Sequence, residues 1–134
     1  MKKMIYFSLL VLLPGLFAAC SSAGPGEAAK KYAQYIADGQ YGKFIDGIAF
    51  DENTTEEQVK EQKEMLAALL REKGKKEIDK RGGLKRIEIV SEDISADGNE
   101  AEVVLKQTYG DGTTDDEDYE MVKKDGVWKM VVRK

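Results

Sequence analysis

This sequence of 134 residues contains no histidine and a single cysteine, Cys20. Without histidine the chain cannot form a Ser-His-Asp triad, a histidine-containing zinc site or an imidazole pH switch. One cysteine excludes an intramolecular disulfide, a thiolate zinc cluster and a Cys-x-x-Cys redox pair. A phosphate-binding glycine loop is also missing, because Gly110-Asp111-Gly112 lacks the remaining motif glycines and the following helix. We therefore expect no catalytic residue, no cofactor and no metal site.

Long apolar runs are absent except at the N-terminus. There Met1-Lys2-Lys3 precedes an apolar segment, 4–13, which Pro14-Gly15 interrupts. The run is too short to cross a bilayer, which takes about 20 apolar residues. Its layout is typical of a secretory signal peptide. We expect residues 1–19 to be removed.

The segment Leu16-Phe17-Ala18-Ala19-Cys20 resembles a bacterial lipobox, in which cleavage leaves a lipidated cysteine at the new N-terminus. A lone exported thiol has no disulfide partner, and acylation of Cys20 would consume it. Two or three acyl chains, as such lipoproteins carry, suffice for stable anchoring. Residues 20–26 then form the lipidated cysteine and its tether. By resemblance to sorting signals, Ser21 favours the outer membrane, facing the periplasm.

The mature chain has the composition of one folded domain, residues 27–134. The whole sequence is 42% hydrophobic, 34% charged and 8% aromatic, which is too apolar for a disordered tail. Its formal net charge is −4, and it falls to −6 once Lys2 and Lys3 are removed. Binding to nucleic acid phosphates prefers the opposite balance, so we expect no nucleic acid partner.

Apolar spacing divides the domain into helices followed by strands. Ala29, Tyr32, Ala33 and Ile36 recur with helical period before Gly39, and Tyr41, Phe44, Ile45 and Ile48 repeat it. A third helix is expected from Thr54, with a Thr54–Glu57 capping box and an apolar stripe of Val59, Leu66, Leu69 and Leu70. Gly74 is expected to interrupt it, and Gly82-Gly83 to end the helix that follows.

After residue 84 the apolar residues recur at every second position instead of every third or fourth. Segments 85–90, 101–106 and 127–132 alternate as half-buried strands do. Asp97-Gly98, Asp111-Gly112 and Asp125-Gly126 supply the positive φ of tight hairpin turns and imply four consecutive antiparallel strands. The expected fold class is α+β, with N-terminal helices packed on a curled four-stranded meander sheet.

A resemblance supports this architecture. Pro25-x-Glu27-x-Ala29-x-x-Tyr32, Gly39-x-Tyr41-x-x-Phe44 and Asp125-Gly126-Val127-Trp128-Lys129 resemble small bacterial lipoproteins of unknown function in the nuclear-transport-factor-2-like superfamily. The resemblance implies a cystatin-like α+β roll, in which a bent sheet wraps around helices to form a cone. Because that fold hosts isomerases, hydrolases and proteins without assigned activity, it does not itself choose a function. It also implies that a homodimer is a candidate assembly.

Two charged segments have ordinary interpretations. The six acidic residues of 111–120 lack the spacing of a calcium loop, and we interpret them as protecting an edge strand from pairing. Whether they bind a cation is left open. The basic segment 71–86 could meet anionic headgroups or a glycan, but interspersed acidic residues favour a solvated helix end.

The function we predict is that of a non-enzymatic, lipid-anchored envelope protein that binds a small apolar ligand or another envelope protein. Two alternatives stay open, a carboxylate-dependent isomerase or hydrolase in the cone and a structural subunit of an envelope complex. The enzyme would need a carboxyl with a raised pKa inside the cone, for which Asp46 and Glu88 qualify by position only. The candidate pocket-lining residues are Tyr32, Tyr41, Phe44, Ile87, Ile89, Val103, Leu105, Trp128 and Met130.

Overall fold

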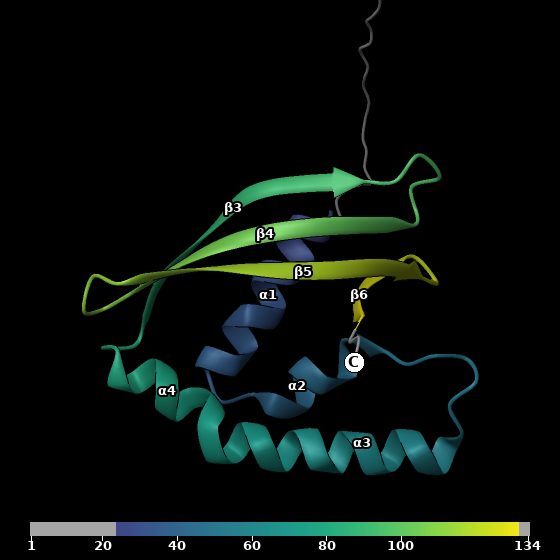
Figure 1. The fold of residues 1–134 in the computed structure, drawn as a ribbon, viewed down its shortest axis with the longest axis horizontal. Helices are drawn as coiled ribbons and strands as arrows, with labels where there is room; N and C mark the ends of the chain where they lie inside the picture. The colour runs from purple at the N-terminus through teal and green to yellow at the C-terminus, as the bar shows by residue number, and fades with distance from the viewer. Residues whose placement is uncertain (1–23, 132–134) are drawn as a thin grey trace, which may run out of the picture.

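A computed structural model describes residues 24–131 of the chain. It confirms the α+β class: helices lie on one side of a curved, mainly antiparallel sheet (Figure 1). The helix α1, Pro25–Ala37, packs against the sheet, and Pro25 occupies its first turn, where a missing N–H costs nothing. Gly39 follows with a φ of 77°, so the chain turns as the glycine predicted.

The second apolar repeat is only partly helical. The helix α2 covers Tyr41–Asp46, but Ile48 lies in a two-residue strand, β2, Ile48–Ala49. This strand pairs in parallel with the last strand of the sheet, and Ile48 lies opposite Met130. The helical assignment of Ile48 was therefore wrong. A contact with a distant segment decides its conformation, and helical spacing cannot reveal such a contact.

The third helix begins one residue later than expected. In α3, Glu56–Leu69, the capping residue is Thr55. Its hydroxyl accepts a hydrogen bond from the Gln58 backbone amide, and the Gln58 side-chain oxygen accepts one from the Thr55 backbone amide. Gly74 does not interrupt the helical path, because the wide π-helical turn Leu70–Gly74 leads directly into α4, Lys75–Lys80. We call α3, this turn and α4 together the helical rod. The rod ends before Gly82 and Gly83, which both have positive φ.

The four-stranded meander is present, and β2 adds a fifth strand. The strands are β3 Leu84–Ile94, β4 Glu100–Tyr109, β5 Thr114–Lys124 and β6 Val127–Val131, in the order β2-β6-β5-β4-β3. All consecutive pairs of the meander are antiparallel. The glycine of each Asp-Gly pair has a positive φ, so all three predicted turns are confirmed.

The edge-strand interpretation of the acidic segment needs a correction, because β5 lies inside the sheet between β4 and β6. The strand β6 is short, however, and among the described residues of β5 it pairs only with Met121–Lys124. The other half of β5, residues 114–120, therefore has a strand neighbour on one side only. Its charges lie along that open half, where they oppose pairing with other chains.

The core lies between α1 and the inner face of the sheet. On β4, Ala101, Val103 and Leu105 alternate with exposed or half-buried residues, and Val103 and Leu105 have no exposed surface. They pack with Ala29 and Ala33 of α1, whose small side chains let the helix approach the sheet. The apolar stripe expected on α3 is incomplete, because Leu69 remains 51% exposed. Among the described residues, no helix is long and apolar enough to span a membrane.

Candidate functional site

Four of the predicted pocket-lining residues lie deep in the core. Val103, Leu105, Trp128 and Met130 are all buried in one cluster between α1 and the sheet. Tyr32 is buried with them, and its hydroxyl donates to the Trp128 carbonyl at 2.6 Å. This part of the expected cone is therefore filled by the protein's own side chains.

The other four candidates are half-buried and already engaged. Phe44, Ile87 and Ile89 pack against the core, and the Tyr41 hydroxyl accepts from the Lys75 amide at 2.9 Å. None of the nine candidates lines either of the two hollows described next. A role for them in ligand binding stays a prediction. Cys20 lies outside the described residues.

An apolar hollow opens between α3 and the segment after β2. Its volume is about 500 Å³, within the range of small-molecule sites. Met65, Leu66 and Leu69 contribute from α3, and Ile48 and Phe50 from the opposite wall. We call this the α3 hollow. Met65 is 73% exposed and Leu69 51%, so two large apolar side chains on one helix face have no partner here.

A second hollow, of about 1030 Å³, is broad and acidic. Glu100, Glu102 and Glu120 line it from the sheet, and Asp51 and Glu52 from the loop after β2. The nearby Asp118 carboxylate, together with burial, raises the pKa of Glu102, as expected where like charges crowd. Across residues 24–131, no three acidic or other ligating side chains are arranged to hold a metal ion.

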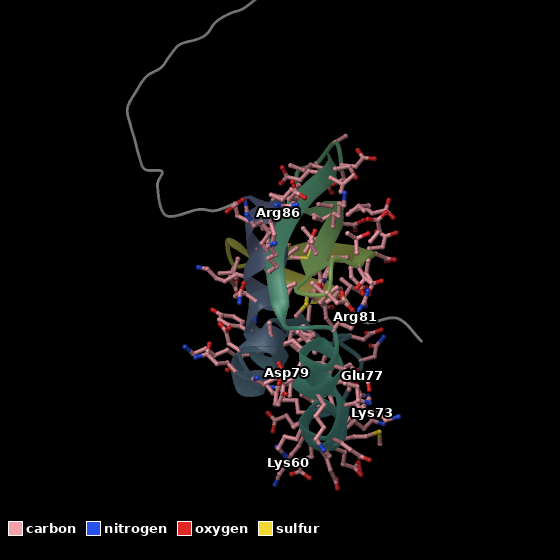
Figure 2. The ribbon with its side chains drawn as sticks, turned by 90° about the vertical axis from the view of Figure 1, so that its left-hand side faces the viewer. Lys60, Lys73, Glu77, Asp79, Arg81 and Arg86 are labelled. Atoms are coloured by element: carbon pink, nitrogen blue, oxygen red, sulfur yellow. The ribbon has the colours of Figure 1, made fainter. Side chains whose placement is uncertain are left out.

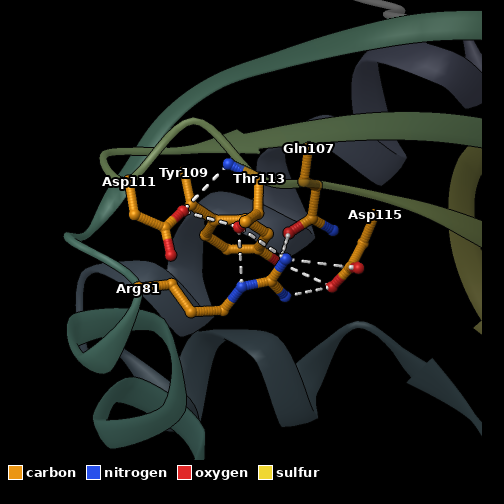
Figure 3. Close-up of polar contacts among 6 residues, drawn as sticks. All are labelled: Arg81, Gln107, Tyr109, Asp111, Thr113 and Asp115. Atoms are coloured by element: carbon orange, nitrogen blue, oxygen red, sulfur yellow. Dashed lines mark hydrogen bonds and ion pairs between the residues drawn. The ribbon is translucent and has the colours of Figure 1, made fainter.

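A polar cluster joins the end of α4 to the β4–β5 hairpin (Figure 3). The Arg81 guanidinium lies 3.9 Å from the centre of the Tyr109 ring and donates to both Asp115 and Thr113. The Tyr109 hydroxyl donates to the side-chain amide oxygen of Gln107 at 3.2 Å and to the Asp115 carboxylate at 3.4 Å. Arg81 therefore acts as a clamp that joins the end of α4 to the hairpin, because its guanidinium contacts Thr113, Asp115 and the Tyr109 ring at the same time.

The backbone reinforces this clamp. The Gly110 amide donates to the Gly83 carbonyl and the Asp111 amide to the Arg81 carbonyl, each at 2.8 Å. Figure 2 places Arg81 where the sheet meets the helical rod, with Lys73 and Glu77 further along that rod. The helix carries its own ion pairs, Lys75–Asp79 at 2.8 Å and Lys80–Glu77 at 3.4 Å.

The pKa values of the two carboxyl groups on the inner face of β5, Asp115 and Glu117, shift in opposite directions. The Arg81 hydrogen bond holds the pKa of Asp115 below its ordinary value. Glu117, which lies opposite Leu105 in the sheet register, has its pKa raised by partial desolvation and further by Asp115. Burial, with Glu117 nearby, also raises the pKa of Tyr119 to about 12. Glu117, which is itself exposed at the surface, thus has the raised carboxyl pKa for which Asp46 and Glu88, also exposed, were considered.

Glu117 is expected to make stability depend on pH. A carboxyl with a raised pKa in the fold costs stability as pH rises through that range, because the folded state disfavours the ionised form. Glu117→Gln should therefore raise the free energy of unfolding at pH 7 and leave it unchanged at pH 3, where both side chains are neutral. Urea unfolding at both values measures this. The control is Asp116→Asn, which makes the same change in charge at a position that is exposed like Glu117 but lies on the opposite face of the sheet. A smaller gain for Glu117→Gln than for the control at pH 7 would contradict the assignment.

The sequence alone indicates that these β5 side chains lie on the inner face of the sheet. Asp115, Glu117 and Tyr119 occur at every second position before the buried Met121. Because alternate side chains of a strand point to the same face, all four lie on the inner face of the sheet. Gln107, which is only 6% exposed, likewise shares its parity with Leu105. The contribution of Arg81 carried no such signal, because it comes from a different element.

The fold defines the class of protein. The chain aligns with the crystal structure of a "Putative NTF2-like transpeptidase" from Campylobacter jejuni, with a TM-score of 0.73 and 17% identity, covering 83% of this chain and 100% of that one. This shows a nuclear-transport-factor-2-like fold, as the sequence resemblance implied.

A family match makes the assignment more specific. Residues 18–131 match the family described as "Domain of unknown function (DUF4878)", and the chain belongs to that family. Aln2 from a Streptomyces species (13% identity, 78% and 80% coverage, TM-score 0.42) and the intermembrane space region of chloroplast protein ARC6 (15%, 79% and 85%, 0.37) are too dissimilar to add to this. No curated protein matches the chain significantly.

Proposed function

We propose that this protein is a non-enzymatic, lipid-anchored envelope protein that binds a small apolar molecule in the α3 hollow. The observation that carries the binding proposal is the hollow itself. It has the volume of a ligand site, an apolar lining, and two exposed side chains, Met65 and Leu69, that gain from being covered. Thr54 and Gln62 at its border offer the few polar groups that would orient a ligand.

Binding is tested with an apolar fluorescent probe, N-phenyl-1-naphthylamine, added to protein that starts at residue 21. We expect saturable binding that Met65→Glu and Leu69→Gln each weaken at least tenfold, since a polar group would then line the apolar wall. Val127→Gln is the matched control, because Val127 is also 51% exposed but lies on β6, away from the hollow. Equal loss in all three variants, or no saturable binding, would refute the proposal.

The anchoring part of the proposal rests on the sequence around Cys20. Mass spectrometry of the mature protein should find Cys20 as the first residue, carrying two or three acyl chains. Cys20→Ala should abolish acylation and release the protein from membranes. A mature protein that begins elsewhere, or an unmodified Cys20, would contradict this prediction.

A carboxylate-dependent enzyme is the second candidate, and Glu117 is the observation that favours it. Its pKa is raised on the inner face of the sheet, beside the protonated phenol of Tyr119. Glu117 lines neither hollow, however, so binding in the α3 hollow has the better support. The name of the Campylobacter jejuni protein suggests peptide transfer, but this sequence has no histidine and only Cys20 as a thiol. A bound compound that wild type converts and Glu117→Gln leaves unchanged would establish the enzyme.

A further inference from the structure

We propose that the last part of β3, around Val90 and Ile94, rests on the lipid surface in which Cys20 is anchored, so that the α3 hollow faces away from that membrane. The inference rests on the lipid anchoring proposed above. It adds which surface of the domain contacts the bilayer.

Only a short length of chain separates the anchor from the domain. Gly24 is the first described residue, and it follows Cys20 by four positions. Four residues span at most about 14 Å even when fully extended. An acylated Cys20 lies at the membrane interface, so the end of the domain that carries Gly24 is held close to it.

This end of the domain is firmly joined to β3. The Gly26 amide in the first turn of α1 donates to the Glu92 carboxylate at 2.8 Å. A Cβ at Gly26 would lie 2.9 Å from both Glu92 and Ile89, so the helix and the strand approach closely. The chain therefore leaves the domain beside the second half of β3, as Figure 1 shows for the start of α1.

Two exposed apolar side chains lie near the point where the chain leaves the domain. Val90 and Ile94 flank Glu92 in sequence and are 58% and 49% exposed. Val90 occupies a bulge between Ile89 and Ser91, where the regular pairing with β4 is interrupted. Exposed apolar side chains next to an acyl anchor gain by entering the interface. The adjacent Asp93 is exposed and would be repelled by anionic headgroups, so the contact fits a zwitterionic surface.

The consequence concerns the α3 hollow. In two views at right angles, Figures 1 and 2, α3 lies at the opposite end of the molecule from β3. With β3 against the lipid, Met65 and Leu69 face the aqueous space. A ligand or partner would then reach the hollow from that space and not from the anchoring bilayer.

The experiment uses the full lipidated protein in phosphatidylcholine vesicles. Acylation consumes the only native cysteine, so Ile94→Cys, Val90→Cys and Met65→Cys each introduce one free thiol. We measure the rate of labelling by a bulky polyethylene glycol maleimide, on vesicles and for the same variants starting at residue 21 in solution. We expect vesicles to slow labelling at positions 90 and 94 at least tenfold and at position 65 less than twofold.

Other outcomes overturn the proposal in distinct ways. Unchanged rates at all three positions would show a domain that stands away from the lipid, and slowing at position 65 alone would show the reverse orientation. Slow, concentration-dependent labelling at 90 and 94 in solution would show that a second copy covers this edge. Flotation with the vesicles and the mass of the acylated protein test the anchor separately, so its failure is distinguishable from a wrong orientation.

Discussion

Replacing Trp128 by alanine is expected to lower the free energy of unfolding by about 3–5 kcal/mol, the cost of deleting a large buried aromatic side chain. Trp128 is 6% exposed and packs with Met130 and Val103 in the core between α1 and the sheet. Its backbone carbonyl also accepts a hydrogen bond from the buried Tyr32 hydroxyl. A cavity at this position would therefore loosen the contact between α1 and β6.

Urea denaturation followed by circular dichroism measures the effect of Trp128→Ala. The matched control is Val127→Ala on the same strand, where the side chain is exposed and the change should stay within about 0.5 kcal/mol. If both variants lose the same small amount, Trp128 does not hold the core together. A Trp128→Phe variant, which retains most of the ring volume, should recover much of the lost stability.

Gly47→Ala is expected to cost about 3 kcal/mol, at the upper end of the range for overpacked sites. Gly47 has a φ of −85°, which any residue can adopt, so the cost comes from lack of space alone. A Cβ at this position would overlap the ring of Tyr32. The ring cannot move aside easily, because it is buried and its hydroxyl is bonded to Trp128.

The chain provides a close control for this prediction. Gly42 lies in α2, and a Cβ there would have nothing within 4 Å. Gly42→Ala should be neutral or stabilising by up to about 1 kcal/mol, since alanine favours a helix over glycine. Thermal unfolding of both variants decides the matter. A Gly47→Ala protein as stable as Gly42→Ala would show that Tyr32 does not fill this space.

Much of the secondary structure could be predicted because it depends on neighbouring residues. The period-two segments and the three Asp-Gly pairs determined the meander, since a tight turn needs positive φ at one position and a strand needs alternation over a few. The start of α3 was missed by one residue because Thr54 and Thr55 both fit a cap, and the partner that completes the box is Gln58.

The candidate site was harder to predict because long-range packing creates it. Leu69 has the helical spacing of a core residue, yet it lies at the α3 hollow with half its surface exposed. The interior candidates Val103 and Leu105 were correctly placed on the inner face but serve packing. Periodicity shows which face a residue occupies, whereas the elements opposite it decide whether that face is filled or open.

By itself, the sequence determined the α+β class, the order of helices before strands and the hairpin turns, because each follows from the conformational preferences of a few consecutive residues. Only the tertiary structure decided that Ile48 pairs with Met130, that Arg81 clamps the β4–β5 hairpin, and that Met65 and Leu69 remain uncovered. Those outcomes depend on how distant elements meet, and the cost of burying or exposing a side chain is set only there.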